Sequence, residues 1–340
     1  MQPKQAIDLK DHPALQQAVS AVAEAVRVVF GQEAQQISVP GGTERASLRV
    51  QLSDRSVIAT RRPAGRAQRM ETRLLQTLAG QGAPVPDYLG HHDGVMFQSD
   101  LGKFRLSEAM LRSNAEQRQL LTARTFESMW RIKVAARVSG LTDGLRPAGT
   151  KDDWLTKFVN FPQKAAWLFP EIPRPKLDKN ALRDSLRVTP DTFVNWDARL
   201  GNAVVSASAQ VSWFDWEFYG QRGGVEDFAF LLADEFFPLP PRLSLPIFRA
   251  ACPKEYLPLE PLMIRFAALR ATRRVMLIRQ RWETQGAEPL ADLLRTDQAG
   301  YTPETVKNLC KHGAMYAGRD KLVKPLVPFF EMAGDVRNWS

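Results

Sequence analysis

The apolar positions of this chain divide it into a strand-containing N-terminal part and a mainly helical remainder. Leucine and valine residues at helical spacing predict a helix between Pro13 and Gly31, packed against the first domain. Residues 37–50 read as a strand, a glycine turn and a second strand, and residues 57–62 as a third strand.

A second helix is predicted over residues 66–79 and ends before Gly80. Its apolar positions at helical spacing are Ala67, Met70, Leu74 and Leu78. The two prolines of residues 83–86 predict an extended linker. His92–Gly94 then predicts a hairpin turn before a strand at residues 95–97.

From residue 105 onward the pattern is mainly helical, with short strands in the middle. Residues 192–194 predict one strand. Residues 203–205 and 211–214, joined by a small polar turn, predict a hairpin. Further helices are expected near residues 258–283 and after residue 302.

Three oxygen-bearing side chains flank this predicted hairpin. Asp197 follows the strand at 192–194, Asn202 precedes the hairpin and Asp215 ends it. Phosphoryl transfer needs one carboxylate for the acceptor hydroxyl, and an amide and a second carboxylate to hold Mg²⁺ against nucleotide phosphates. The pattern therefore predicts Asp197 as the base and Asn202 and Asp215 as metal ligands. Ordinary turn residues on a surface hairpin are the alternative.

Residues 195–202, 213–217 and 223–229 together resemble the aminoglycoside phosphotransferase and choline kinase-like family. That family typically has His-Gly-Asp-x-x-x-Gly-Asn, then Asp-Trp-Glu after an apolar strand, then Gly-x-x-x-Asp-(Leu/Phe)-Ala. The resemblance implies that Asp227 braces the catalytic loop, although a helix-starting carboxylate favoured by the dipole would look the same. The chain departs from the family at Asn195-Trp196, where a loop-organising His and a small residue are usual.

The resemblance also implies a fold class. It is an α+β, bilobal protein-kinase-like fold, with a small antiparallel-sheet N-lobe and a mainly helical C-lobe. At 340 residues the chain is long for a single core, which agrees with two lobes. We expect an N-terminal nucleotide-binding lobe over 1–98, a hinge over 99–104, and a C-terminal catalytic and acceptor-binding lobe over 105–340.

The resemblance implies that the glycine turn faces the nucleotide phosphates through its backbone N–H groups. On its own such a turn is usually only a hairpin. Its candidate phosphate-binding residues are Gly41, Gly42, Thr43 and Ser47. Arg61, which shares a strand face with Ala59, would replace the kinase lysine as a fixed cation, and Arg62 is the second choice. In some relatives the basic residue falls where Thr60 lies.

Two further contacts follow from the resemblance. Glu71, on the helix at 66–79, could form an ion pair with Arg61, as the kinase glutamate does with its lysine; a solvated Glu71 is the alternative. Backbone groups near Phe97 and Ser99, where the N-terminal lobe meets the hinge, would contact adenine.

Aromatic residues are concentrated in a proline-rich stretch between residues 141 and 178. They are Trp154, Phe158, Phe161, Trp167 and Phe169. Two interpretations stay open. These rings could line an acceptor pocket, or, as is more common for such spacing, form the core of a helical insertion.

The net charge of +9 narrows the possible partners. Arginines are concentrated at residues 61–69 and on the helix near 258–283, without interleaved stacking residues, so we expect no nucleic-acid partner. A nucleotide pocket explains the first group. The second group is either a solvated helix face or a border of the acceptor site. In the latter case it would favour a neutral or anionic small molecule over a cationic aminoglycoside.

Cysteine and histidine chemistry adds little. Cys252 and Cys310 are far apart in the sequence, and all four histidines lie outside the motifs, so we expect no disulfide, zinc site or Ser-His-Asp triad. No apolar run is long enough to span a membrane and no secretion signal is present. We therefore expect a cytoplasmic protein without a membrane contact.

These observations predict a Mg²⁺-dependent phosphotransferase that uses ATP or GTP on a hydroxyl of a small molecule. Asp100-Leu101-Gly102 is most similar to the family branch that phosphorylates amino sugars such as N-acetylmuramate or N-acetylglucosamine, so a sugar or amino sugar is the predicted acceptor. The alternative is a non-catalytic, nucleotide-binding regulatory module. Asn195 and the arginine at the position of the kinase lysine favour that alternative, and the joint presence of Asp197, Asn202 and Asp215 opposes it.

Overall fold

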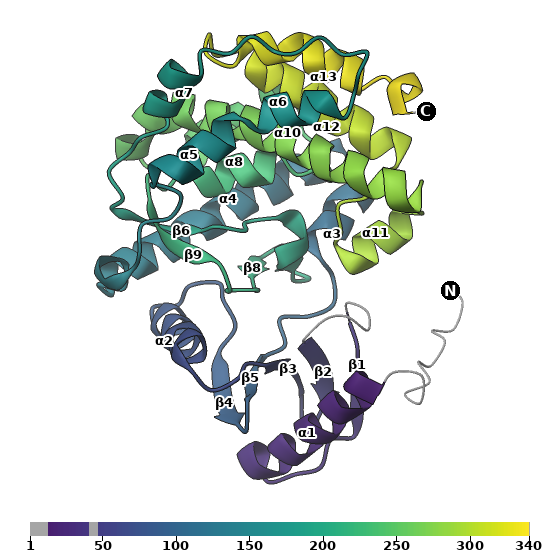
Figure 1. Ribbon diagram of the computed structural model, residues 1–340. Helices are drawn as coiled ribbons and strands as arrows, with labels where there is room; N and C mark the ends of the chain where they lie inside the picture. The colour runs from purple at the N-terminus through teal and green to yellow at the C-terminus, as the bar shows by residue number, and fades with distance from the viewer. Residues whose placement is uncertain (1–12, 41–46, 340) are drawn as a thin grey trace. The chain divides into compact units, whose positions relative to one another are not determined.

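The computed structural model describes residues 13–40 and 47–339, which form two compact units (Figure 1). The first unit contains the described residues up to Ala79 together with Val85–Leu101. The second contains Gly80–Pro84 and the chain from Gly102 onward. Each unit has its own core.

Within the described residues, the first unit is built on a five-stranded antiparallel sheet with the strand order β1–β2–β3–β5–β4. Its elements are α1 (Pro13–Phe30), β1 (Gln36–Ser38), β2 (Ser47–Gln51), β3 (Ser56–Arg61), α2 (Arg66–Gly80), β4 (Tyr88–His92) and β5 (Val95–Ser99). The predicted N-terminal helix and strands are confirmed.

Helix α1 covers one face of this sheet, because strand alternation places apolar side chains on that face. The strand residues of this core are Leu48, Val50, Val57, Ala59, Val95 and Phe97. The opposite face is more polar: the Ser47 and Thr60 hydroxyls lie 2.9 Å apart across β2 and β3. The sheet therefore has a core face under α1 and a polar face.

The turn between β4 and β5 is the predicted hairpin. Asp93 and Gly94 both have positive φ, 42° and 73°. A two-residue turn of this kind matches the twist of antiparallel strands and favours Asp-Gly. Helix α2 differs from its prediction by a rotation: Gln68, Glu71 and Leu75 are buried with Leu74 and Leu78, whereas Ala67 is exposed.

The second unit is mainly helical. Its helices are α3 (Leu106–Arg112), α4 (Ala115–Val138), α5 (Asp152–Val159), α6 (Phe161–Trp167), α7 (Lys179–Ser185), α8 (Glu226–Leu232), α9 (Pro241–Ala251), α10 (Glu260–Gln285), α11 (Leu290–Thr296), α12 (Pro303–Ala317) and α13 (Val327–Ala333). Its strands are β6 (Thr192–Asn195), β7 (Ala203–Val205), β8 (Val211–Trp213) and β9 (Tyr219–Arg222). Short 3₁₀ turns are η2 (Thr142–Gly144), η3 (Leu200–Asn202), η4 (Lys254–Leu259), η5 (Lys324–Leu326) and η6 (Val336–Trp339).

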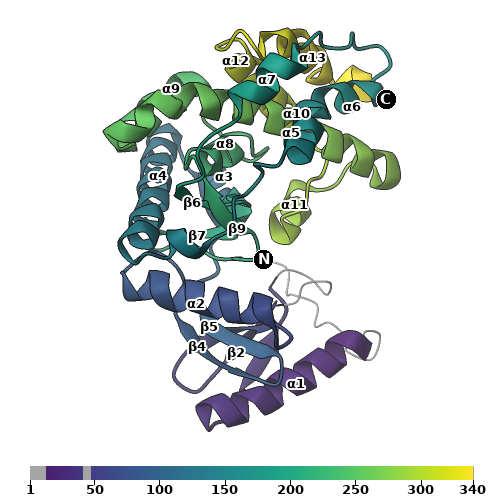
Figure 2. The same cartoon turned by 60° about the vertical axis from the view of Figure 1, so that its left-hand side comes forward.

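Two long helices organise this unit (Figure 2). Helix α4 begins at a capping box, in which Asn114 and Gln117 each accept the other's backbone N–H. It packs against β6, β8 and α9, and α10 packs against α6, α8 and α12. The strands form two antiparallel pairs, β6 with β9 and β7 with β8. Strand β9 is not predicted by the sequence, because Tyr219–Arg222 lacks an apolar run.

The small antiparallel sheet and the helical second unit confirm the predicted α+β class. None of the described helices combines the length and the apolar composition that crossing a membrane requires.

Candidate active site

The start of the candidate catalytic loop is held by backbone N–H groups. Strand β6 ends at Asn195, whose N–H donates to Asp227 Oδ2 on α8 (3.0 Å). The Asn195 Oδ1 atom accepts the Asp197 N–H (3.2 Å), a local bond that side chains of this type form at turns. Asn195 therefore organises the loop as the histidine of the resemblance would, and the predicted bracing by Asp227 is confirmed.

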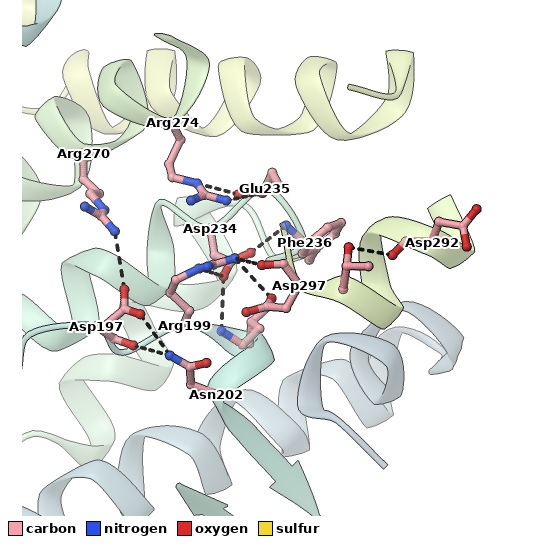
Figure 3. Close-up of polar contacts among 12 residues, drawn as sticks. Asp197, Arg199, Asn202, Asp234, Glu235, Phe236, Arg270, Arg274, Asp292 and Asp297 are labelled. Carbon is pink, nitrogen blue, oxygen red and sulfur yellow. Dashed lines mark hydrogen bonds and ion pairs between the residues drawn. The ribbon is translucent and has the colours of Figure 1, made fainter. Parts of the chain in front are cut away.

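Asp197 and Asn202 form a hydrogen-bonded pair (Figure 3). Asn202 Nδ2 donates to the carbonyl oxygen of Asp197 (3.0 Å) and to its Oδ2 (3.1 Å). The Asp197 side chain is 32% exposed, so a solute can reach it. Because Nδ2 faces Asp197, the Asn202 Oδ1 atom is the one that could bind a cation.

The hairpin β7–β8 brings Asp215 to the same end as Asn202. Ala203 pairs with Trp213, and the Phe214 N–H donates to the Asn202 carbonyl (3.0 Å). Asp215 follows directly with a φ of 67°, in the left-handed region that Asp and Asn tolerate better than other non-glycine residues. The predicted hairpin is confirmed, and both candidate ligands are at one end of it.

The donor set at this end fits Mg²⁺. An amide oxygen and a carboxylate are hard donors, and Mg²⁺ is usually held by one or two protein carboxylates together with substrate phosphates and water. Across residues 13–40 and 47–339, no three His, Cys, Asp or Glu residues converge on a common metal position. A site made by Asn202 and Asp215 would thus be completed by a nucleotide. Their role as ligands stays a prediction.

A buried ion pair between Lys133 and Asp227 holds the strand that precedes the loop. Lys133 Nζ on α4 contacts Asp227 Oδ2 and donates to the Phe193 carbonyl (2.8 Å). Burial raises the pKa of Asp227 to about 6, and the Lys133 charge and the Asn195 N–H act against this rise. Lys133 cannot be predicted from the sequence, because no local pattern distinguishes it from the solvated lysines of other helices.

Replacing Lys133 with methionine should destabilise the protein by about 3–5 kcal/mol, because the Asp227 carboxylate would stay buried without its cation. Adding Asp227→Leu removes that charge and should restore part of the loss. Urea unfolding followed by circular dichroism measures both effects, with Lys157→Met at an exposed lysine as the control. A Lys133→Met protein as stable as the control would contradict this role.

The second half of the loop is tied to a segment far away in the sequence (Figure 3). Arg199 Nη2 donates to Asp297 Oδ1 (3.1 Å) and to its carbonyl (3.2 Å), and the Leu200 N–H donates to Asp234 Oδ2 (3.1 Å). Burial alone would lower the pKa of Arg199, but the charges of Asp297, Asp234 and Glu235 raise it above its usual value. Arg199 is therefore a permanent cation that connects the loop to the residue after α11.

Gly201 makes this connection possible. A Cβ atom at Gly201 would lie 1.8 Å from Asp297 Oδ1, so any side chain there would displace Asp297. Gly201 does not have a positive φ. The 3₁₀ turn η3 that contains Gly201 therefore does not itself require glycine, and the close approach of Asp297 does.

In the first unit Glu71 pairs with Arg62 and not with Arg61. Arg62 Nε lies 2.7 Å from Glu71 Oε2, and both side chains are largely buried. Arg61 is exposed, on the strand face that Val57 and Ala59 share. The predicted Arg61–Glu71 pair is wrong by one residue, and so is the solvated alternative for Glu71. By alternation Arg62 instead follows Thr60 on the polar face of the sheet.

The sequence profile of the Phosphotransferase enzyme family matches residues 35–262, which is more than half of the chain. The chain belongs to this family. No curated protein sequence matches it. The family match makes the chain a small-molecule kinase, as the motifs around Asp197 predict.

Solved structures of similar fold include further small-molecule kinases. The choline kinase LicA from Streptococcus pneumoniae shares 12% identity with a TM-score of 0.52, over 86% of this chain and 99% of that one. An aminoglycoside phosphotransferase from Alicyclobacillus acidocaldarius shares 15% identity with a TM-score of 0.51, over 88% and 93%. The GDP complex of wild-type aminoglycoside 2′-phosphotransferase-IIIa shares 15% identity with a TM-score of 0.51, over 82% and 97%. These similarities confirm the predicted protein-kinase-like fold.

The other predicted nucleotide contacts of this phosphotransferase are only partly described. Three of the predicted phosphate-binding residues, Gly41, Gly42 and Thr43, lie outside the described residues. The Phe97 ring is buried in the core against Phe30. The Ser99 N–H donates to the Asp87 carbonyl (2.9 Å), so the carbonyl is the backbone group of Ser99 that is left for the predicted adenine contact. The contacts of Ser47 and Phe97 with a nucleotide stay predictions.

The aromatic stretch of the phosphotransferase is largely core. Phe158 and Phe169 are buried, and the Trp154 ring stacks on Phe158 with their centroids 4.7 Å apart. Trp167 is 56% exposed. The interpretation as the core of a helical insertion is thus confirmed for Phe158 and Phe169 and wrong for Trp167.

For this phosphotransferase we expect Arg62 to determine nucleotide affinity. Arg62→Gln removes a fixed cation that Glu71 orients, and should weaken MgATP binding about 10- to 100-fold. Arg61→Gln removes the same charge from the neighbouring exposed residue and should change the affinity less than about twofold. Titration calorimetry distinguishes the two variants. Equal losses in both would show that the orientation by Glu71 is irrelevant.

Proposed function

We propose that this kinase transfers the γ-phosphoryl group of ATP or GTP to a hydroxyl of a small molecule, with a sugar or amino sugar as the acceptor. The observation that carries the proposal is the position of Asp197, Asn202 and Asp215 around one end of a hairpin, with Asp197 accessible to solutes. Phosphoryl transfer depends mainly on positioning and charge stabilisation, and these side chains are of the types that provide both.

Each residue has a distinct role in this proposal. Asp197 accepts a hydrogen bond from the acceptor hydroxyl and takes its proton as the new bond forms. Asn202 holds Asp197 through Nδ2 and, with Asp215, would bind Mg²⁺, which neutralises the developing charge on the phosphates. Arg62, oriented by Glu71, contributes a cation for the phosphates.

The rigidity of the loop also supports catalysis rather than binding alone. The Asp227 and Asp234 carboxylates and the Arg199 guanidinium hold the backbone on both sides of Asp197. A loop held at several points keeps a base within reach of a substrate proton. Asn195, whose difference from the family pattern favours a regulatory module, keeps this bracing in place.

The proposal is tested by nucleoside diphosphate release from ATP or GTP in the presence of a panel of hydroxyl compounds. The panel contains hexoses, N-acetylated amino sugars, amino alcohols and nucleosides, each measured with Mg²⁺ and with excess EDTA. We expect Mg²⁺-dependent release, matched one to one by a phosphorylated acceptor in mass spectrometry. Nucleotide binding in a thermal shift without phosphorylation of any panel member would instead support the non-catalytic regulatory module.

A further inference from the structure

Helix α10 carries six arginines, and most of them are matched by carboxylates. The pairs are Arg265–Asp320 (2.9 Å), Arg274–Glu235 (2.9 Å), Arg279–Glu283 (3.1 Å) and Arg281–Glu288 (2.6 Å). The interpretation of these arginines as a solvated helix face is therefore wrong. Within the part of the chain that the structure describes, Arg270 and Arg273 differ from the other four, because neither donates a hydrogen bond to a carboxylate.

Arg270 and Arg273 rest on aromatic rings instead. The Arg270 guanidinium carbon lies 4.5 Å from the centroid of Phe230, and that of Arg273 lies 5.2 Å from the centroid of Phe161. Contact with a ring occupies the flat face of a guanidinium and leaves the N–H groups at its edge unused. The aromatic supports therefore fix both cations and keep their donors available.

Arg270 points toward the candidate base (Figure 3). Its Nη2 atom lies 3.8 Å from Asp197 Oδ1, too far for a hydrogen bond. Arg270 is only 8% exposed, whereas the Asp197 side chain beside it is open to solutes. The N–H groups of Arg270 thus face the space beside Asp197 in which a phosphoryl acceptor would lie.

Arg270 lies beside Asp197, and the same carboxylate also acts electrostatically on Arg273, so two cations share one negative charge. Burial and the nearby Arg274 and Arg273 lower the pKa of Arg270 to about 9, and Asp197 offsets only part of this. Arginines at helical spacings of three and four residues also repel each other. A buried cation is costly unless a charge partner compensates it, and a bound anion would be such a partner.

We propose that Arg270 and Arg273 form an anion subsite beside Asp197, which binds a carboxylate or phosphate group of the acceptor. The subsite deepens the proposed function and rests on it. It places the acceptor anion on α10 and the acceptor hydroxyl at Asp197. Cationic acceptors are repelled from the same position.

The test compares acceptors in which the anionic member carries a carboxylate- or phosphate-bearing group in place of one free hydroxyl of the neutral member. The matched pairs are glucuronate with glucose, glucose 6-phosphate with glucose, and N-acetylmuramate with N-acetylglucosamine. The wild type should show a kcat/KM at least about 10-fold higher for the anionic member of at least one pair, and the preferred pair separates carboxylate from phosphate. Equal use of both members in all three pairs would overturn the subsite.

Variants then connect this preference to the two arginines. Arg270→Gln and Arg273→Gln should each lower kcat/KM for the anionic member by about 10- to 100-fold, and change that for the neutral member by less than about threefold. Arg270→Lys keeps the charge and should recover part of the loss, and Arg281→Gln on the same helix is the matched control. An equal fall in kcat for both members would mean that these arginines act on the transferring phosphoryl group, and the subsite would be wrong.

Direct binding separates this proposal from the proposed function. Calorimetric titration of glucuronate, glucose 6-phosphate and N-acetylmuramate, without nucleotide, should show binding to the wild type that is lost in Arg270→Gln and kept in Arg281→Gln. If no compound is phosphorylated but this pattern holds, the subsite stands and the phosphotransfer proposal fails. Absent or variant-independent binding of all three anions overturns the subsite. Thermal unfolding of Arg273→Gln, at a partly exposed position, confirms that any loss occurs in a folded protein.

Discussion

Replacing Asp197 with asparagine is expected to lower kcat by about 10²- to 10⁴-fold, the range that general acid–base catalysis contributes. Asparagine has nearly the same shape, so the hydrogen bond from Asn202 to the Asp197 carbonyl is retained. It cannot take a proton, however. The affinity for MgATP should change by less than about threefold, because Asp197 is assigned to the acceptor and not to the nucleotide.

The measurement is a kcat determination on the best acceptor of the panel, together with MgATP titration by calorimetry. Asp191→Asn is the matched control, because it makes the same chemical change at an exposed position before β6. A kcat within a few-fold of wild type in Asp197→Asn would remove Asp197 from the role of base. A large loss of nucleotide affinity would place Asp197 at the metal instead.

The second large effect is expected at Asp215. Losing this carboxylate should lower kcat at least about 100-fold and abolish the increase in nucleotide affinity that Mg²⁺ gives, because a bound metal ion stabilises the transition state by several kcal/mol. The backbone of Asp215 guides the choice of variant. At a φ of 67°, alanine would add strain of about 1–2 kcal/mol, whereas asparagine tolerates this region as aspartate does.

Asp215→Asn is therefore the informative variant, and Asp215→Ala serves to measure the backbone contribution through its urea midpoint. Nucleotide affinity is titrated with and without Mg²⁺ for both, and Ser212→Ala, in the same hairpin, is the control. A Mg²⁺-dependent affinity that survives in Asp215→Asn would contradict the ligand assignment. A loss confined to Asp215→Ala would assign the effect to strain.

The sequence predicts the centre of the candidate site well because that chemistry is local. Asp197, Asn202 and Asp215 lie within one strand–loop–hairpin segment, and the apolar runs at 203–205 and 211–214 fix the pairing that brings Asn202 close to Phe214. The bracing by Asp227 could be predicted only from the resemblance, because it joins residues 32 positions apart.

The errors arise where neighbouring residues are chemically equivalent. Arg61 and Arg62 differ only in the strand face they occupy, and a shift of one residue exchanges those faces. The choice between the two arginines depends on α2. Glu71 lies on the buried side of this helix, whereas the spacing of the apolar residues predicts a buried side that is shifted by one residue. No property of the two arginines in sequence reveals this.

Long-range contacts make up the rest of what the sequence does not show. Lys133 and Asp227 are 94 residues apart, and Arg199 and Asp297 are 98 apart. Arginines on α10 are visible in the sequence, but which of them donate a hydrogen bond to a carboxylate depends on Asp320, Glu235, Glu283 and Glu288. Tertiary packing leaves Arg270 and Arg273 on aromatic rings, with Arg270 facing Asp197.

The fit between Gly201 and Asp297 has a consequence for protein engineering. The candidate catalytic loop and the connection between α11 and α12 fit so closely that the Cβ of any side chain at Gly201 would overlap Asp297. A chimera that imports the loop of a relative with a larger residue at this position would have to import the matching connection as well. The two segments are therefore exchangeable only together.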